Sequence, residues 1–128
     1  QTRACVYCDV NGLHELNNSQ GHEAGDEMLK AVAVILRNYF GDEHSYRIGG
    51  DEFVAFVLDE ATEDIKKKTE AVARKLEAKG YYVSVGISIG RPRNLTEMEE
   101  LVKKAETEMY AAKKIFYENG GRDRRGRM

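Results

Sequence analysis

Two aspartates stand where the chain turns, and carboxylates in such places can bind a divalent cation. Asp9 lies near the end of an apolar run, residues 4–10, and Asp51 directly follows the pair Gly49-Gly50. Two carboxylates brought together repel each other unless a proton or a cation lies between them. Mg²⁺ binds one or two carboxylates and fills its other positions with waters and substrate phosphates. Aspartates at turns are also common as caps or solvated charges, so the pair alone leaves both interpretations open.

The charges of the chain are divided unevenly between its two halves. Residues 1–60 carry 4 basic and 11 acidic side chains, whereas residues 61–128 carry 16 and 11, and the net charge of the whole chain is −2. An acidic half that binds a cation and a basic half that meets phosphate would suit a metal–nucleotide site, although solvated helix faces explain the same distribution. Because the net charge is small, we expect neither nucleic acid nor a membrane surface as a partner of this domain.

Strands and helices must bring the two acids together, and the hydrophobic pattern predicts where these elements lie. Strands are predicted over residues 4–10, 44–48, 53–58 and 83–89, and amphipathic helices over about residues 23–40, 63–79 and from residue 96 onward. Thr96 and Glu99 form a capping box that would begin the third helix. We expect Gly49 and Gly50 to supply the positive φ angles of a tight hairpin turn.

The element order β-α-β-β-α-β with an additional C-terminal helix predicts an α+β fold of the ferredoxin-like type. In this arrangement the first strand lies beside the third and runs antiparallel to it. The end of the first strand, with Asp9, therefore meets the start of the third, with Asp51. A chain of 128 residues with 41% hydrophobic side chains has the size and apolar content of one compact domain, residues 1–128.

The predicted hairpin carries a specific motif, Arg47-Ile48-Gly49-Gly50-Asp51-Glu52-Phe53. Further groups stand at matching distances along the chain: Asp9-Val10-Asn11-Gly12-Leu13, Asn17, Gly21-His22-x-x-Gly25-Asp26, and AETEMYAAK over residues 105–113. On these residues the chain resembles the GGDEF family, the catalytic domains of bacterial diguanylate cyclases. The resemblance spans residues 9–113 and implies the palm-like fold of nucleotidyl cyclases and polymerases. It also implies a reaction in which two GTP molecules are condensed into cyclic di-GMP and two pyrophosphates.

The resemblance implies a metal-binding and catalytic set. The side chains of Asp9 and Asp51 and the carbonyl of Val10 would bind Mg²⁺ or Mn²⁺. Asp51 would also help to deprotonate the attacking 3′-hydroxyl, and Glu52 belongs to the same catalytic motif. The motif glycines Gly49 and Gly50 would let the backbone pass close beneath the α-phosphate, where a Cβ would intrude.

The resemblance further implies a substrate-binding set. Backbone N–H groups of Gly12, Leu13 and His14 would cradle the terminal phosphates, as helix starts do. Asn17 and Asp26 would recognise guanine, and Lys113 would pair with phosphate. Taken singly, these side chains are equally compatible with an Asx turn, a first-turn helix acid and an exposed lysine.

Two positions depart from the family pattern and keep a second function open. His14 stands where a lysine is usual, and Tyr117 stands where an arginine is expected, with Lys114 or Arg122 as substitutes. We expect a homodimeric enzyme, because each domain would hold one GTP. The alternative is a catalytically weak GTP-binding module that regulates an attached domain, and a third is a protein-interaction domain of the same fold.

The cellular setting is inferred from cysteine usage and hydropathy. Cys5 and Cys8 lie on one predicted strand, and we expect two buried thiols in a reducing compartment, hence a cytoplasmic domain. No apolar run has the length of a transmembrane helix. We expect the domain to be truncated at its N-terminus and to belong to a longer multidomain signalling protein with sensory or other signalling domains.

Overall fold

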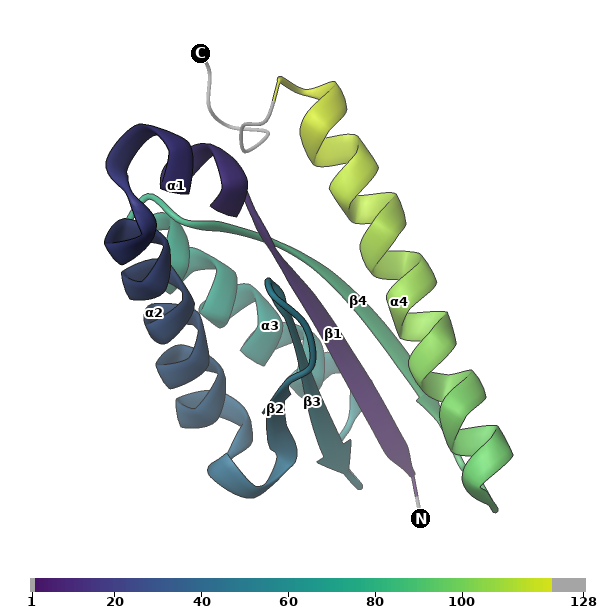
Figure 1. The fold of residues 1–128 in the computed structure, drawn as a ribbon. Coiled ribbons are helices and arrows are strands. Elements are labelled where there is room, and N and C mark those ends of the chain that lie inside the picture. Colours follow the sequence, from purple (N-terminus) through teal and green to yellow (C-terminus); the bar gives the residue numbers. More distant parts are fainter. Residues whose placement is uncertain (1, 121–128) are drawn as a thin grey trace.

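Four antiparallel strands form one sheet with helices on both faces, as the computed structural model of residues 2–120 shows (Figure 1). The strands are β1 (Arg3–Asn11), β2 (Ser45–Arg47), β3 (Glu52–Leu58) and β4 (Tyr82–Gly90), in the order β2-β3-β1-β4. The helices are α1 (Leu13–Gln20), α2 (His22–Phe40), α3 (Thr62–Glu77) and α4 (Leu95–Glu118), with a short 3₁₀ helix, η1 (Asp42–His44). The predicted α+β fold, with β1 beside β3 and a C-terminal helix, is confirmed.

Strand β1 lies in the middle of the sheet and is buried on both faces. Its even-numbered side chains, from Ala4 to Val10, pack in the core under α2 and α3, whereas Cys5 and Tyr7 pack in a second core under α4. This double burial explains why the strand is a nearly continuous apolar run rather than an alternating one. Cys5 and Cys8 are both buried free thiols, as predicted.

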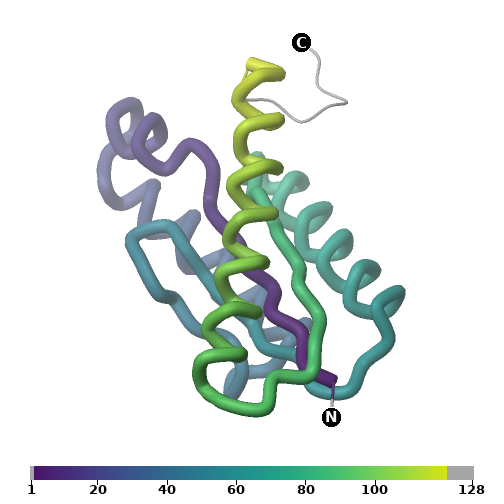
Figure 2. Tube along the Cα trace, turned by 90° about the vertical axis from the view of Figure 1, so that its right-hand side faces the viewer, coloured from purple at the N-terminus to yellow at the C-terminus, as the bar shows by residue number. Residues whose placement is uncertain are grey.

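Helix α4 covers the face of the sheet opposite α2 and α3, and runs along β1 and β4 (Figure 2). It approaches β4 closely at Gly86, where an added Cβ would collide with the carbonyl oxygen of Ala105 and the backbone N of Met109. Only glycine allows the two backbones to come this close. Glycine at position 86 therefore permits the close approach of α4 to β4.

Two local features differ from the sequence prediction. Residues 13–20 form a separate helix, α1, which the hydrophobic pattern did not reveal. The N-cap of helix α4 is Asn94, two residues before the predicted cap Thr96, and the Asn94 side chain accepts a hydrogen bond from the N–H of Glu97 at 2.9 Å. Thr96 therefore lies inside the helix and not at its cap. Within residues 2–120, no helix has the length and hydropathy that crossing a membrane requires.

The tight contact at Gly86 predicts a large loss of stability on substitution. Gly86→Ala should lower the free energy of unfolding by about 2–3 kcal/mol, because α4 must move away from the sheet. Urea unfolding followed by circular dichroism would measure the change. Gly90→Ala is the matched control in the same strand: its Cβ would meet only a side-chain methyl, Leu101 Cδ1, at 3.3 Å, and should cost less than about 1 kcal/mol. Equal losses in the two variants would contradict this account of the contact.

Candidate functional site

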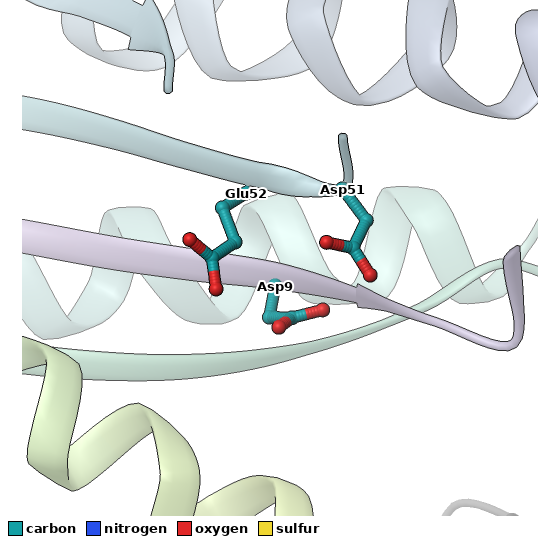
Figure 3. Close-up of side chains that lie close together, drawn as sticks. All are labelled: Asp9, Asp51 and Glu52. Carbon is teal, nitrogen blue, oxygen red and sulfur yellow. The ribbon is translucent and has the colours of Figure 1, made fainter. Parts of the chain in front are cut away.

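Three carboxylates converge where β1 and β3 lie side by side (Figure 3). Each of Asp9, Asp51 and Glu52 offers one oxygen, and these oxygens all lie within 4.8 Å of one another. Asp9 on β1 stands opposite Glu52 on β3, and the N–H of Val10 donates to the carbonyl oxygen of Asp51 at 2.8 Å. The predicted meeting of Asp9 and Asp51 thus follows from the antiparallel register of these two strands.

Asp9 is the most deeply buried of the three carboxylates, with 2% of its surface exposed. Lys113 from α4 donates to Asp9 Oδ2 at 3.0 Å, whereas Oδ1 has no hydrogen-bond partner within residues 2–120. Burial raises the pKa of Asp9 to about 6, with the charges of Asp51 and Glu52 acting in the same direction and Lys113 opposing them. The three carboxylates therefore carry more negative charge than the ammonium group of Lys113 neutralises.

This donor set fits a small divalent cation. Carboxylate oxygens are the ligands that Mg²⁺ and Mn²⁺ prefer, and one or two protein carboxylates leave room for waters and phosphates. A buried acceptor without a partner, such as Asp9 Oδ1, is costly unless a ligand satisfies it. Asp9 and Asp51 are the predicted side-chain ligands, and Glu52 lies close enough to contribute. The role predicted for the Val10 carbonyl stays a prediction.

The hairpin tip between β2 and β3 exposes Gly49 and Gly50. Neither residue has a positive φ, so the expectation that these glycines serve the turn geometry was wrong. A Cβ on Gly50 would meet no atom of residues 2–120 within 4 Å, and one on Gly49 would make only ordinary contacts with Glu52. Arg47 holds the tip by donating to the carbonyl oxygens of Gly49 at 3.1 Å and Gly50 at 2.7 Å. The fold itself thus gives no reason for glycine at position 50.

The predicted phosphate cradle lies at the start of α1, immediately after β1. Gly12 is the N-cap of this helix and has a φ of 79°, a conformation that favours glycine. The first N–H groups of a helix, here those of Leu13 and His14, have no partners inside the helix. The Gly12 N–H donates to the hydroxyl oxygen of Tyr117 at 3.2 Å, so α4 reaches the cradle as well as Asp9.

The two predicted guanine-binding residues lie in different surroundings. Asp26 is exposed and lines a cleft of about 270 Å³ between α2 and the hairpin, together with Leu29, Arg47 and Phe53. Asn17 does not line this cleft: its side chain packs so closely on Gly25 that an added Cβ there would collide with Asn17 Oδ1. That oxygen is buried without a hydrogen-bond partner in the described part of the chain.

The positions that depart from the family pattern have defined contacts. His14 is exposed and its ring Nε2 lies 3.1 Å from the side-chain N of Asn18. The Tyr117 hydroxyl accepts the hydrogen bond from the Gly12 N–H, as described above, and Lys114 is exposed on α4. Arg122, the other predicted substitute for the missing arginine, lies outside the described residues.

Several side chains of the site were not predicted from the sequence. The Tyr7 hydroxyl lies within donating distance of the carboxylates of Glu52 and Glu106, and the buried side chains of Asn11 and Ser84 hydrogen-bond each other beside Asp9. Two regularities could have identified part of this set. Tyr7 precedes Asp9 by two residues and so shares its face of β1, and Glu106 precedes Lys113 by seven residues, two turns along the same face of α4.

Comparisons with known proteins agree with these observations. The model of the family described as diguanylate cyclase, GGDEF domain, matches residues 1–118. Over 120 residues the chain is 33% identical to the signaling protein YkoW of Bacillus subtilis, covering 84% of this chain and 15% of YkoW. Over 116 residues it is 32% identical to the diguanylate cyclase DosC of Shigella sonnei, covering 83% of this chain and 25% of DosC. The chain thus spans a quarter or less of the length of these relatives.

A solved structure supports the fold. The GGDEF domain of DgcB from Caulobacter crescentus, in complex with c-di-GMP, superposes with a TM-score of 0.80 at 21% identity. The match covers 96% of this chain and 75% of that chain. At this identity the likeness shows the arrangement of strands and helices.

The raised pKa of Asp9 predicts how stability depends on pH when no metal is present. Because the folded pKa of about 6 exceeds the ordinary value of 3.8, the folded state binds the proton more tightly. In EDTA, the free energy of unfolding should therefore fall by about 2 kcal/mol as the pH rises from 4 to about 7. Asp9→Asn should lack this decline and be the more stable protein at pH 7.5. Parallel pH profiles from urea titrations of the two proteins would contradict the prediction.

Proposed function

The chain belongs to the GGDEF family of diguanylate cyclase domains, and on that premise we propose that it condenses two GTP molecules into cyclic di-GMP and two pyrophosphates as a metal-dependent homodimer. The 3′-oxygen of one GTP attacks the α-phosphorus of the other, a new P–O bond forms, and pyrophosphate leaves. The 3′-oxygen of the second GTP then attacks the α-phosphorus of the first, which closes the ring and releases the second pyrophosphate. Such transfers depend chiefly on positioning and on electrostatic stabilisation.

The observation that carries this proposal is the group of three carboxylates beside an open glycine backbone. Asp9, Asp51 and Glu52 offer oxygens within 4.8 Å of one another, and Asp9 keeps one oxygen without a partner in residues 2–120. Bound Mg²⁺ or Mn²⁺ would supply positive charge for the α-phosphate and ease removal of the proton from the 3′-hydroxyl. Asp51 would take that proton. The open space in front of Gly50 would receive the phosphate, and a side chain at this position would intrude on it.

The remaining residues would hold the rest of the nucleotide. The N–H groups of Gly12, Leu13 and His14 would receive the terminal phosphates at the start of α1. Lys113 would leave Asp9 and pair with a phosphate oxygen. Asp26 would accept hydrogen bonds from the guanine N1 and N2 donors at the cleft beside α2, with Asn17 as the second predicted contact.

The setting of the domain is also part of the proposal. Each domain would hold one GTP, so a homodimer would be needed for turnover. We further propose a cytoplasmic domain within a longer signalling protein, joined to sensory or other signalling domains. Its free thiols suit a reducing compartment, and the relatives DosC and YkoW are several times longer than this chain.

A second candidate function is GTP binding without turnover. Two observations favour it: the exposed His14 at a position where the family has a lysine, and Tyr117 on the Gly12 N–H where an arginine is expected. A neutral hydroxyl attracts phosphate less strongly than a guanidinium does. Such a domain would signal through an attached domain by the presence or absence of bound GTP.

Product formation distinguishes the two functions. Incubation of the full-length protein with GTP and Mg²⁺, followed by chromatography, should yield cyclic di-GMP. Asp51→Ala should lower the rate at least about 100-fold, because it removes a pre-organised charged group from the reacting centre. Asp64→Ala, on the exposed start of α3, is the control and should retain the rate. GTP binding without cyclic di-GMP would favour the regulatory function, and an active Asp51→Ala variant would contradict the mechanism.

The ion pair between Lys113 and Asp9 predicts opposite effects on metal and on nucleotide. The ammonium group and a metal ion would compete for Asp9 Oδ2, so Lys113→Met should raise the Mn²⁺ affinity of the nucleotide-free protein about tenfold. The same variant should bind GTP more weakly, since it loses a phosphate partner. Mn²⁺ titrations at pH 8.5, where Asp9 is ionised, would measure the first effect, with the exposed Lys103→Met as control. Weaker Mn²⁺ binding by Lys113→Met would show that the two cations do not compete.

A further inference from the structure

A series of hydrogen-bonded side chains connects Glu52 to helix α4. Tyr7 Oη lies 2.9 Å from Glu52 Oε1 and 3.3 Å from Glu106 Oε2. Tyr110 Oη lies 3.5 Å from the same oxygen of Glu106. Because Tyr7 belongs to β1 and Glu106 to α4, this series ties a carboxylate of the candidate site to two other elements of the fold.

The phenol of Tyr7 is held firmly in place. Only 4% of the residue is exposed, and its ring lies in the core beneath α4. The buried members of that core are Cys5, Tyr7, Val54, Leu101, Ala105 and Met109. A ring packed in this way cannot turn without displacing its neighbours, so its hydroxyl has a fixed position. A buried tyrosine hydroxyl also needs a polar partner, and here both partners are carboxylates.

The phenol has one proton for two acceptors. The Tyr7 hydroxyl is the donor in both contacts, because an ionised carboxylate can only accept. A single O–H can point fully toward only one of the two carboxylates, and Glu52 makes the shorter contact. Glu52 is the half-buried first residue of β3, next to the hairpin tip. Its hydrogen bond to Tyr7 limits the directions in which its carboxylate can point.

We propose that Tyr7 is a positioning residue for Glu52, which it holds toward Asp9 and Asp51, and that Glu106 competes for the same phenolic hydrogen bond. In Figure 3 the carboxylates of Glu52 and Asp51 both point toward Asp9. The inference rests on the proposed function in one respect, that Glu52 belongs to a metal site. Partners that orient a ligating carboxylate commonly contribute 10–100-fold to metal affinity or activity.

Tyr7→Phe removes the hydroxyl and keeps the packed ring. The Mn²⁺ affinity, measured by electron paramagnetic resonance with and without a GTP analogue that carries a methylene between its α- and β-phosphorus atoms, should fall about tenfold. In turnover, excess Mn²⁺ should restore most of the lost rate, because Glu52 itself is still present. Tyr39→Phe, on α2 at a distance from the carboxylates, is the matched control and should bind Mn²⁺ like the wild type. Thermal unfolding in EDTA would confirm that both variants are folded.

Glu106→Gln tests the competition with the opposite sign. The amide can donate to Tyr7 Oη, which leaves the phenol proton entirely to Glu52. The Mn²⁺ affinity should therefore be equal to or higher than that of the wild type. A tenfold loss in Glu106→Gln, matching that of Tyr7→Phe, would overturn the proposal, because Glu106 would then act as a ligand in its own right.

The experiment separates the failure of this inference from that of the proposed function. If the wild type binds Mn²⁺ but forms no cyclic di-GMP, the proposed function fails, and the comparison of Mn²⁺ affinities still decides the role of Tyr7. If the wild type is active and Tyr7→Phe keeps both its Mn²⁺ affinity and its metal dependence, the positioning role is wrong and the function stands. Absence of Mn²⁺ binding in the wild type would overturn the positioning role.

Discussion

The charge of Asp9 is buried in the middle of the sheet, and the rest of the site is arranged around it. Strand β1 is covered on both faces, so this carboxylate loses its water, which costs several kcal/mol unless other charges compensate. Lys113, 104 residues further along the chain, supplies one compensating charge. Asp51 and Glu52 add to the imbalance. The features that cost stability in the metal-free protein are thus the ones that would give a cation its affinity.

Helix α4 connects the two ends of the site. Glu106, Tyr110, Lys113 and Tyr117 follow one another at spacings of four, three and four residues, which places them along one helical face. Through this face the helix contacts Tyr7, Asp9 and the Gly12 N–H. Because the helix packs directly on β4 at Gly86, these contacts share one support. A shift of α4 would therefore disturb the carboxylates and the phosphate cradle together.

The sequence predicts the parts of this structure that depend on local pattern and on strand order. The approach of Asp9 to Asp51 needed only the antiparallel pairing of β1 with β3, which the element order implies. Helix α1 was missed because it has eight residues, among them Asn17, Asn18 and Ser19, which have low helix propensity. The predicted cap Thr96 was wrong, because the Asn94 side chain accepts from the N–H of Glu97 and caps the helix two residues before it. Contacts such as that of Tyr7 with Glu52 depend on packing between distant segments.

The geometry of the hairpin also bears on the proposed requirement for two copies of the domain. In-line transfer requires the attacking oxygen to approach the α-phosphorus opposite the leaving pyrophosphate. In the proposed arrangement the α-phosphate would lie over Gly50, near the carboxylates of Asp9 and Asp51. The attacking 3′-hydroxyl would then arrive from the exposed side of Gly49 and Gly50, on a second GTP held by another copy. The fold does not require this tip to be open. In a two-fold symmetric dimer, the open tips of the two copies would face each other and bring the two half-sites together.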